Sequence, residues 1–170
     1  MLTKAGIERY FLAEKQESLL FMAVGVAAMI LAIVFFFILK SSFFRGASIP
    51  LIAISLIQIM VGYSVYARSD EQRINIVYSY DIEPSKIKGE ELTRMKTVNK
   101  NFILYRYVEI ALAASGLFLI GFYRTNADTR FWFGLGLTLC IQSLFMLVAD
   151  YFAEKRAKEY TNAIEWFMQE

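Results

Sequence analysis

Two ionisable residues, Arg106 and Glu109, lie inside a long apolar stretch of the sequence, where charged groups are rare. Residues three apart on a helix share one face, so this guanidinium and this carboxylate can pair. Charged side chains within a membrane span are costly to bury and commonly mark a functional site. The two residues therefore predict either a structural ion-pair clamp or a polar site that binds an ion, a proton or a partner.

Other polar residues are predicted to lie at a similar depth, because they stand near the ends of the neighbouring apolar stretches. Glu17 precedes the first stretch, Tyr63 lies near the end of the second, and Asp150 ends the fourth. Glu109 is seven residues inside its own stretch, which is about 10 Å along a helix. We expect one polar layer here, which is either an interhelical clamp centred on Arg106 or a cavity or patch for a solute or a partner.

Two glutamines, Gln58 and Gln142, lie deeper in their apolar stretches. We expect them either to hydrogen-bond each other across the bundle or to line a narrow polar path. They are 84 residues apart, as are Lys40 and Arg124. This spacing is either the trace of a parallel internal repeat or a chance coincidence.

Several kinds of chemistry are absent from the sequence. The 170 residues include no histidine, which removes the commonest zinc ligand, the usual haem ligand and the most frequent acid–base group. The single cysteine, Cys140, cannot form an internal disulfide or a redox pair. We therefore expect no enzymatic activity, no catalytic residues, no metal site and no cofactor. The net charge of only +2 gives no reason to expect nucleic acid as a partner.

Four long apolar stretches must position the polar residues. A helix needs about 20 apolar residues to cross a bilayer, and the chain is 57% hydrophobic. The sequence predicts an all-α integral membrane protein with four transmembrane helices arranged as two hairpins, and with amphipathic cytoplasmic helices at both termini. The predicted segments are an N-terminal segment 1–17, transmembrane helices 18–39 and 46–67, a connector 68–101, transmembrane helices 102–123 and 131–150, and a C-terminal helix 151–170.

The distribution of basic residues predicts the orientation, because cytoplasmic segments of membrane proteins are enriched in Lys and Arg. Segments 1–17, 68–101 and 151–170 contain 13 of the 18 basic residues, and the two short turns contain four. We therefore expect an integral protein of the bacterial inner membrane with both termini in the cytoplasm.

Some segments allow two interpretations. Residues 74–82 alternate between apolar and polar types, as in a strand, but they also fit a helical extension of the second apolar stretch. Ser48 is expected to cap the second helix, with Pro50 in its first turn. The C-terminal helix is expected either to lie on the membrane surface or to pack on the N-terminal segment or another chain.

Two functional classes follow. The first is a non-enzymatic membrane protein that binds a protein partner or a second copy of itself, as an assembly subunit, a regulator or an immunity protein against a toxin. The second is a small proton- or cation-coupled transporter or channel that acts as an oligomer, with Glu109 as the coupling carboxylate.

Overall fold

Four long helical units make up the described part of the chain, and each is long and apolar enough to cross a membrane. The computed structural model describes residues 2–125 and 127–167, and all of its regular structure is helical. The elements, in chain order, are α1 (Lys4–Val34), the π-helical turn η1 (Phe35–Leu39), α2 (Ser42–Ile82), α3 (Pro84–Lys86), η2 (Ile87–Glu91), α4 (Leu92–Tyr123), η3 (Ala127–Thr129) and α5 (Arg130–Phe167).

The second helix starts earlier and extends further than the apolar stretch within it. Ser41 caps α2 by accepting a hydrogen bond from the backbone N–H of Phe44 at 3.4 Å. The predicted cap at Ser48 is therefore wrong, and Pro50 lies inside the helix. The same helix continues without interruption through residues 74–82, so the strand interpretation of that segment is also wrong.

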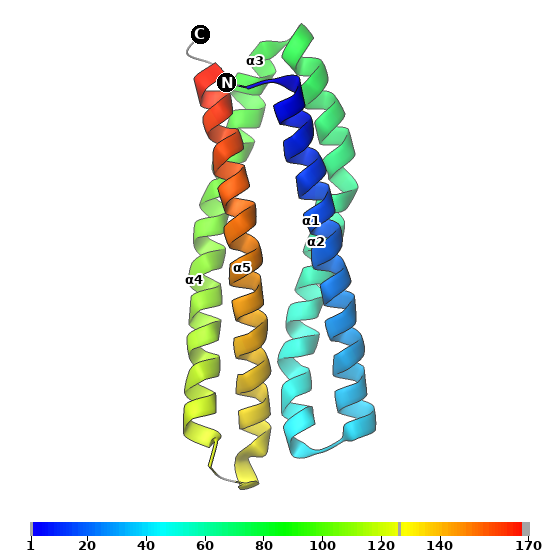
Figure 1. Ribbon diagram of the computed structural model, residues 1–170, viewed down its shortest axis with the longest axis vertical. Coiled ribbons are helices and arrows are strands. Elements are labelled where there is room, and N and C mark those ends of the chain that lie inside the picture. The colour runs from blue at the N-terminus through cyan, green and yellow to red at the C-terminus, as the bar shows by residue number, and fades with distance from the viewer. Residues whose placement is uncertain (1, 126, 168–170) are drawn as a thin grey trace.

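The helices pack as two pairs that meet through α2 and α5. The first pair is α1 with α2, the second is α4 with α5, and α1 contacts α5 only slightly. Both termini lie at one end with α3, and the turns within each pair lie at the other, which we call the hairpin end (Figure 1). Because α2 and α5 both run away from the hairpin end, they are parallel neighbours.

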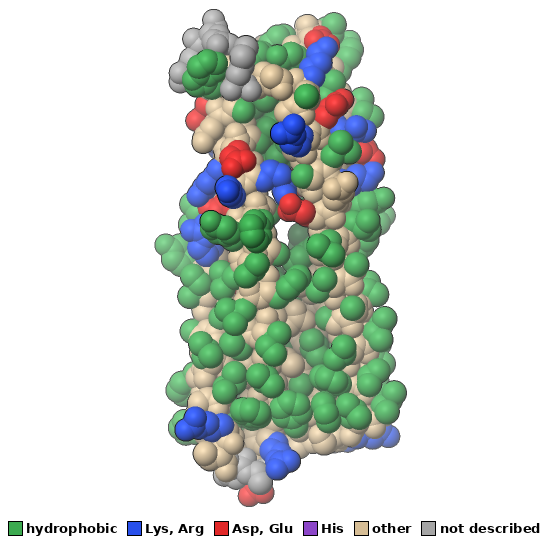
Figure 2. Space-filling view, viewed as in Figure 1, with side chains coloured by type: hydrophobic (Ala, Val, Ile, Leu, Met, Phe, Trp, Pro, Cys, Tyr) green, Lys and Arg blue, Asp and Glu red, His purple; other side chains and the backbone are tan. Residues whose placement is uncertain are grey.

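An apolar band separates two charged regions along the molecule (Figure 2). Exposed Tyr151 and exposed Trp132 stand near opposite edges of this band on α5. The 19 residue steps from Trp132 to Tyr151 span about 28 Å at 1.5 Å per residue, close to the thickness of a hydrocarbon core. Aromatic residues of these types favour membrane interfaces, so the band has the height and the edges expected of a membrane-spanning region.

Close contact between α2 and α5 depends on two glycines. A Cβ atom on Gly46 would lie 1.9 Å from the carbonyl oxygen of Phe131, and one on Gly134 would lie 2.2 Å from that of Phe43. Each phenylalanine precedes the glycine of its own helix by three residues, and the two pairs are 88 residues apart. The contact is therefore reciprocal, as between two equivalent helices.

The same spacing of 88 residues aligns other identical residues of α2 and α5. These residues are not aligned by the spacing of 84 residues considered above. In the 88-residue register the two glutamines discussed above are not equivalent. The aligned identical residues include Phe43 with Phe131, Gly46 with Gly134, Ser55 with Ser143, Tyr63 with Tyr151, Arg68 with Arg156, and Glu71 with Glu159.

Beyond the apolar band, residues 2–17, 68–101 and 151–167 form a helical region that we call the head. Its core includes the fully buried side chains of Ile7, Ile87 and Ile164. Tyr10 of α1 and Tyr160 of α5 stack there with ring centroids 4.1 Å apart. Residues 151–167 thus continue α5, and Tyr160 packs on α1.

Candidate functional site

The predicted polar layer is divided among three separate contacts. Arg106 does not pair with Glu109, which is three residues away on the same helix. Its guanidinium instead forms an ion pair with the buried carboxylate of Glu154 on α5. Lys158 pairs with the other oxygen of Glu154 at 2.7 Å. One buried acid therefore joins two partly exposed cations on the face where α4 meets α5.

Glu109 lies deeper, beside Asp150 of α5. Only 2% of its surface is exposed, and neither carboxylate oxygen has a hydrogen-bond partner among the described residues. The structure thus brings together two of the predicted site residues as a pair of acids, while Arg106 pairs with Glu154 instead. Such a pair is chemically suited to exchange a proton or to hold a small cation.

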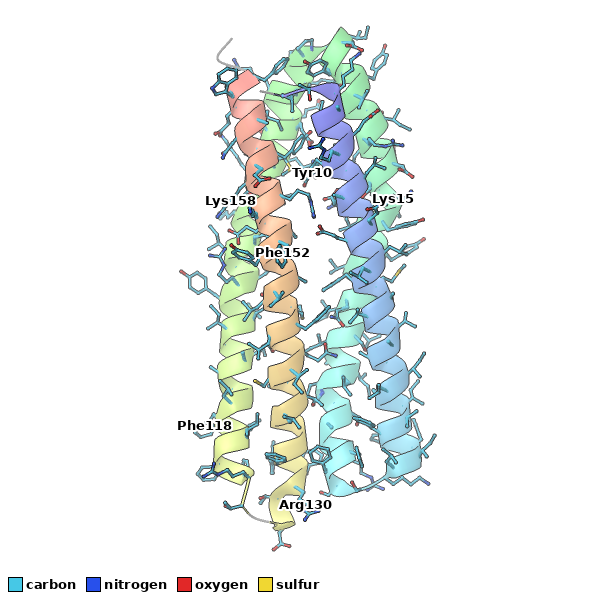
Figure 3. The ribbon with its side chains drawn as sticks, viewed as in Figure 1. Tyr10, Lys15, Phe118, Arg130, Phe152 and Lys158 are labelled. Carbon is cyan, nitrogen blue, oxygen red and sulfur yellow. The ribbon has the colours of Figure 1, made fainter. Side chains whose placement is uncertain are left out.

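Glu17 belongs to a different contact, between the two helix pairs. Its carboxylate forms an ion pair with Arg156, which joins α1 to α5 near the base of the head. Tyr63 is 63% exposed and contacts none of these charged groups among the residues that the structure describes. Figure 3 shows Lys15 and Lys158 at a similar height on the two pairs of helices, near this level.

Gln58 is fully buried in the apolar band, and neither atom of its amide has a hydrogen-bond partner in the described part of the chain. The predicted bond to Gln142, which is also buried, is therefore not formed. Gly25 of α1 packs directly on this position, since a Cβ on Gly25 would lie 2.9 Å from the Cβ of Gln58. A buried amide without partners is costly, so this position weakens the bundle unless water or another polar group reaches it.

A second polar group, which was not predicted from the sequence, lies inside the head. Arg94 donates two hydrogen bonds to Glu91, at 2.7 and 2.8 Å, and Glu91 is only 3% exposed. The guanidinium also stands over the ring of Phe11. The i, i+3 spacing of Glu91 and Arg94 was visible in the sequence, but nothing there indicated that the connector folds into a core.

Glu14 of α1 lies close enough to Arg94 and Glu91 to interact with their charges. Its carboxylate accepts a hydrogen bond from the hydroxyl of Ser69 at 3.5 Å. Burial raises the pKa of Glu14, while Arg94, Arg68 and Arg156 act in the opposite direction. Burial also raises the pKa values of Tyr10 and Tyr160. The phenol of Tyr10 donates a hydrogen bond to the sulfur of Met95 at 3.6 Å. All four long helices thus contribute to a polar centre in the head.

Comparison of the chain with models of protein families, with curated proteins and with solved structures gave no match.

Proposed function

We propose that this chain is a non-enzymatic integral membrane protein that acts by binding a protein partner through its head. The observation that carries the proposal is a row of apolar side chains on α2, Ile74, Tyr78 and Ile82, which are 61%, 63% and 64% exposed. Their four-residue spacing places them on one face of the helix. Contiguous apolar surface outside a membrane is characteristic of sites where proteins interact.

The surroundings of this apolar row support a protein rather than lipid as its occupant. The row begins six residues beyond Arg68, which is about 9 Å outside the apolar band. A shallow depression between α1 and α2 is lined by Ile74 and Tyr78 together with the charged side chains of Glu8, Arg73 and Asp81. An apolar centre with a polar rim is the usual composition of a protein–protein interface.

The proposal places the head in the cytoplasm, with the spans in a bacterial inner membrane. It rests on the basic residues, since 13 of 18 lie in segments 1–17, 68–101 and 151–170. The partner classes that fit are a membrane assembly, a regulated protein and a membrane-acting toxin. A second copy of the chain is also included.

The test uses a photo-crosslinking amino acid at position 82 of the full chain in cells. We expect a discrete crosslinked protein that is lost in the Ile74→Ser/Tyr78→Ser background. The matched control is Trp166→Ser, which removes an exposed aromatic side chain from α5 and should leave the crosslink unchanged. Absence of any crosslink, or an equal crosslink in all three backgrounds, would contradict the proposal.

A second function is favoured by one specific observation, the buried Glu109 with no hydrogen-bond partner for either oxygen among the described residues. In this alternative the chain is an oligomeric proton- or cation-coupled transporter, and Glu109 with Asp150 binds the coupling ion. Ion flux in proteoliposomes should then be abolished by Glu109→Gln and preserved by Glu165→Gln, a change in an exposed pair of the head. Absence of flux from the intact protein under every imposed gradient rules this alternative out.

A further inference from the structure

Four basic side chains lie at the hairpin end, opposite the head. Lys40 and Arg45 belong to the first turn, and Arg124 and Arg130 belong to the second. All four are exposed. None of them forms an ion pair within the residues that the structure describes. Lys and Arg side chains are visible there, below the apolar band (Figure 2).

The net positive charge of the protein is concentrated at this end, although most of its basic residues lie in the head. Residues 40–45 and 124–130 contain four basic residues and one acidic residue, Asp128, so their net charge is +3. The net charge of the full chain is +2, so the remainder has a net charge of −1. Most Lys and Arg residues lie in the head, but acidic residues there balance them, so the net positive charge lies at the hairpin end.

Packing of α2 against α5 brings the backbones next to Arg45 and Arg130 into contact. Arg45 and Arg130 directly precede Gly46 and Phe131, the residues of the close contact between these helices. Both helices also begin at this end, so the positive ends of their dipoles point the same way. The like charges repel one another, and an anion held between them would relieve that repulsion.

The position of these cations at the edge of the apolar band indicates which anion they would meet. Trp132 is 45% exposed and stacks on Tyr123 with ring centroids 6.0 Å apart. These aromatic side chains mark the edge of the apolar band, where lipid headgroups begin. The phosphate groups of phospholipids lie at the same level, so the cations meet them without leaving the membrane surface.

We propose that the hairpin end is a binding surface for the phosphate groups of anionic phospholipids, with Arg45 and Arg130 at its centre. This interaction is separate from the proposed function of the head, and it is independent of which side of the membrane the hairpin end faces. Basic residues at a membrane surface each strengthen binding to anionic lipid by about fivefold.

Trp132 provides a reporter at the surface itself. The chain has two tryptophans, so Trp166→Phe leaves Trp132 as the only one. The Trp166→Phe protein is reconstituted in phosphatidylcholine vesicles that contain either brominated phosphatidylglycerol or brominated phosphatidylcholine. We expect stronger quenching by the brominated phosphatidylglycerol at equal mole fraction, and a preference that falls about fivefold for each cation removed by Arg45→Gln and Arg130→Gln.

The matched control is Lys100→Gln/Lys155→Gln, which removes two exposed cations from the head and should leave the preference unchanged. Circular dichroism of each variant checks that the helices are intact. Equal quenching by both lipids, or an unchanged preference in a folded Arg45→Gln/Arg130→Gln protein, overturns the proposal. Loss of the preference on adding inorganic phosphate, at constant ionic strength, would assign the surface to free phosphate and contradict a lipid site.

Discussion

Replacing Gly46 with alanine tests the packing of α2 on α5, which holds the two helix pairs together. The added Cβ would lie 1.9 Å from the carbonyl oxygen of Phe131, whereas real Cβ atoms essentially never approach other atoms within 3.0 Å. The obstacle is backbone, so it cannot rotate away as a side chain would. The two helices must therefore separate by about 1 Å at this point.

The expected cost follows from this displacement. Overfilling a packed interior typically costs about 1 to 3 kcal/mol, and a separation of 1 Å also weakens the neighbouring contacts. One such contact is the 3.0 Å hydrogen bond from the hydroxyl of Thr138 to the carbonyl of Ala47. Alanine recovers about 0.5 to 1 kcal/mol of helix stability relative to glycine. We expect a net loss of about 2 kcal/mol, which is roughly a 30-fold change in the folded-to-unfolded ratio.

Unfolding by sodium dodecyl sulfate in mixed micelles, followed by circular dichroism, measures this loss. The matched control is Gly121→Ala in α4, where a Cβ would have nothing within 4 Å. The control should be neutral or slightly stabilising, because only the gain in helix stability applies. If both variants unfold at the same detergent fraction, α2 and α5 do not meet at Gly46, and the arrangement of the two pairs is wrong.

Three further predictions concern the polar contacts, each measured as a free energy of unfolding. Glu154→Gln should cost about 1 to 2 kcal/mol, because two cations lose their shared acid; Glu165→Gln should change stability by less than about 0.5 kcal/mol, and equal losses would refute the contact. Arg94→Met should cost about 3 kcal/mol, since it leaves the buried Glu91 carboxylate unpaired; a loss below about 1 kcal/mol would show that Glu91 is solvated. Burial raises the pKa of Glu14 above 4.5, so the folded state holds this proton more tightly than the unfolded state does. The stability of the folded state therefore falls as the pH rises from about 4.5 through the raised pKa. Glu14→Gln should therefore gain stability relative to the parent as the pH rises above the ordinary pKa of glutamate, and a difference that stays constant with pH would contradict the buried position.

The predicted helices depended on local properties of the chain. Four apolar stretches of about 20 residues were enough to predict four long apolar helices, and the structure contains them. The predicted boundaries were less accurate, because hydropathy detects the part of a helix that is apolar and not where the helix ends. The start of α2 at Ser42 depends on the cap at Ser41, which lies outside the apolar stretch.

The contacts of the candidate site were harder to predict. The sequence indicated that Arg106, Glu109 and Asp150 lie at similar depth, but it did not indicate which side chains touch. Pairing along one helix favoured Arg106 with Glu109, whereas the structure pairs Arg106 with Glu154 on α5. Residue spacing on one helix is a local property, while the partner across an interface depends on how two helices are rotated and aligned.

The alignment of α2 with α5 also depended on tertiary contacts and not on residue spacing alone. The 84-residue spacing relied on two coincidences of residue type, Gln58 with Gln142 and Lys40 with Arg124, and not on any contact between helices. The 88-residue register became visible only through the reciprocal contacts of Gly46 and Gly134. Close backbone approach requires a missing side chain on one helix opposite a carbonyl on the other, and that requirement links residues far apart in the chain.

The sequence by itself determined that this protein is built from four helices suited to a membrane, because each helix satisfies its own backbone hydrogen bonds and its apolar surface suits lipid. Only the tertiary structure decided how the polar residues are used. It buried Glu109 beside Asp150, enclosed Glu91 and Arg94 in the head, and left Tyr78 exposed on α2. The physical reason is that burial and pairing depend on the relative rotation and register of packed helices, which no single stretch of sequence contains.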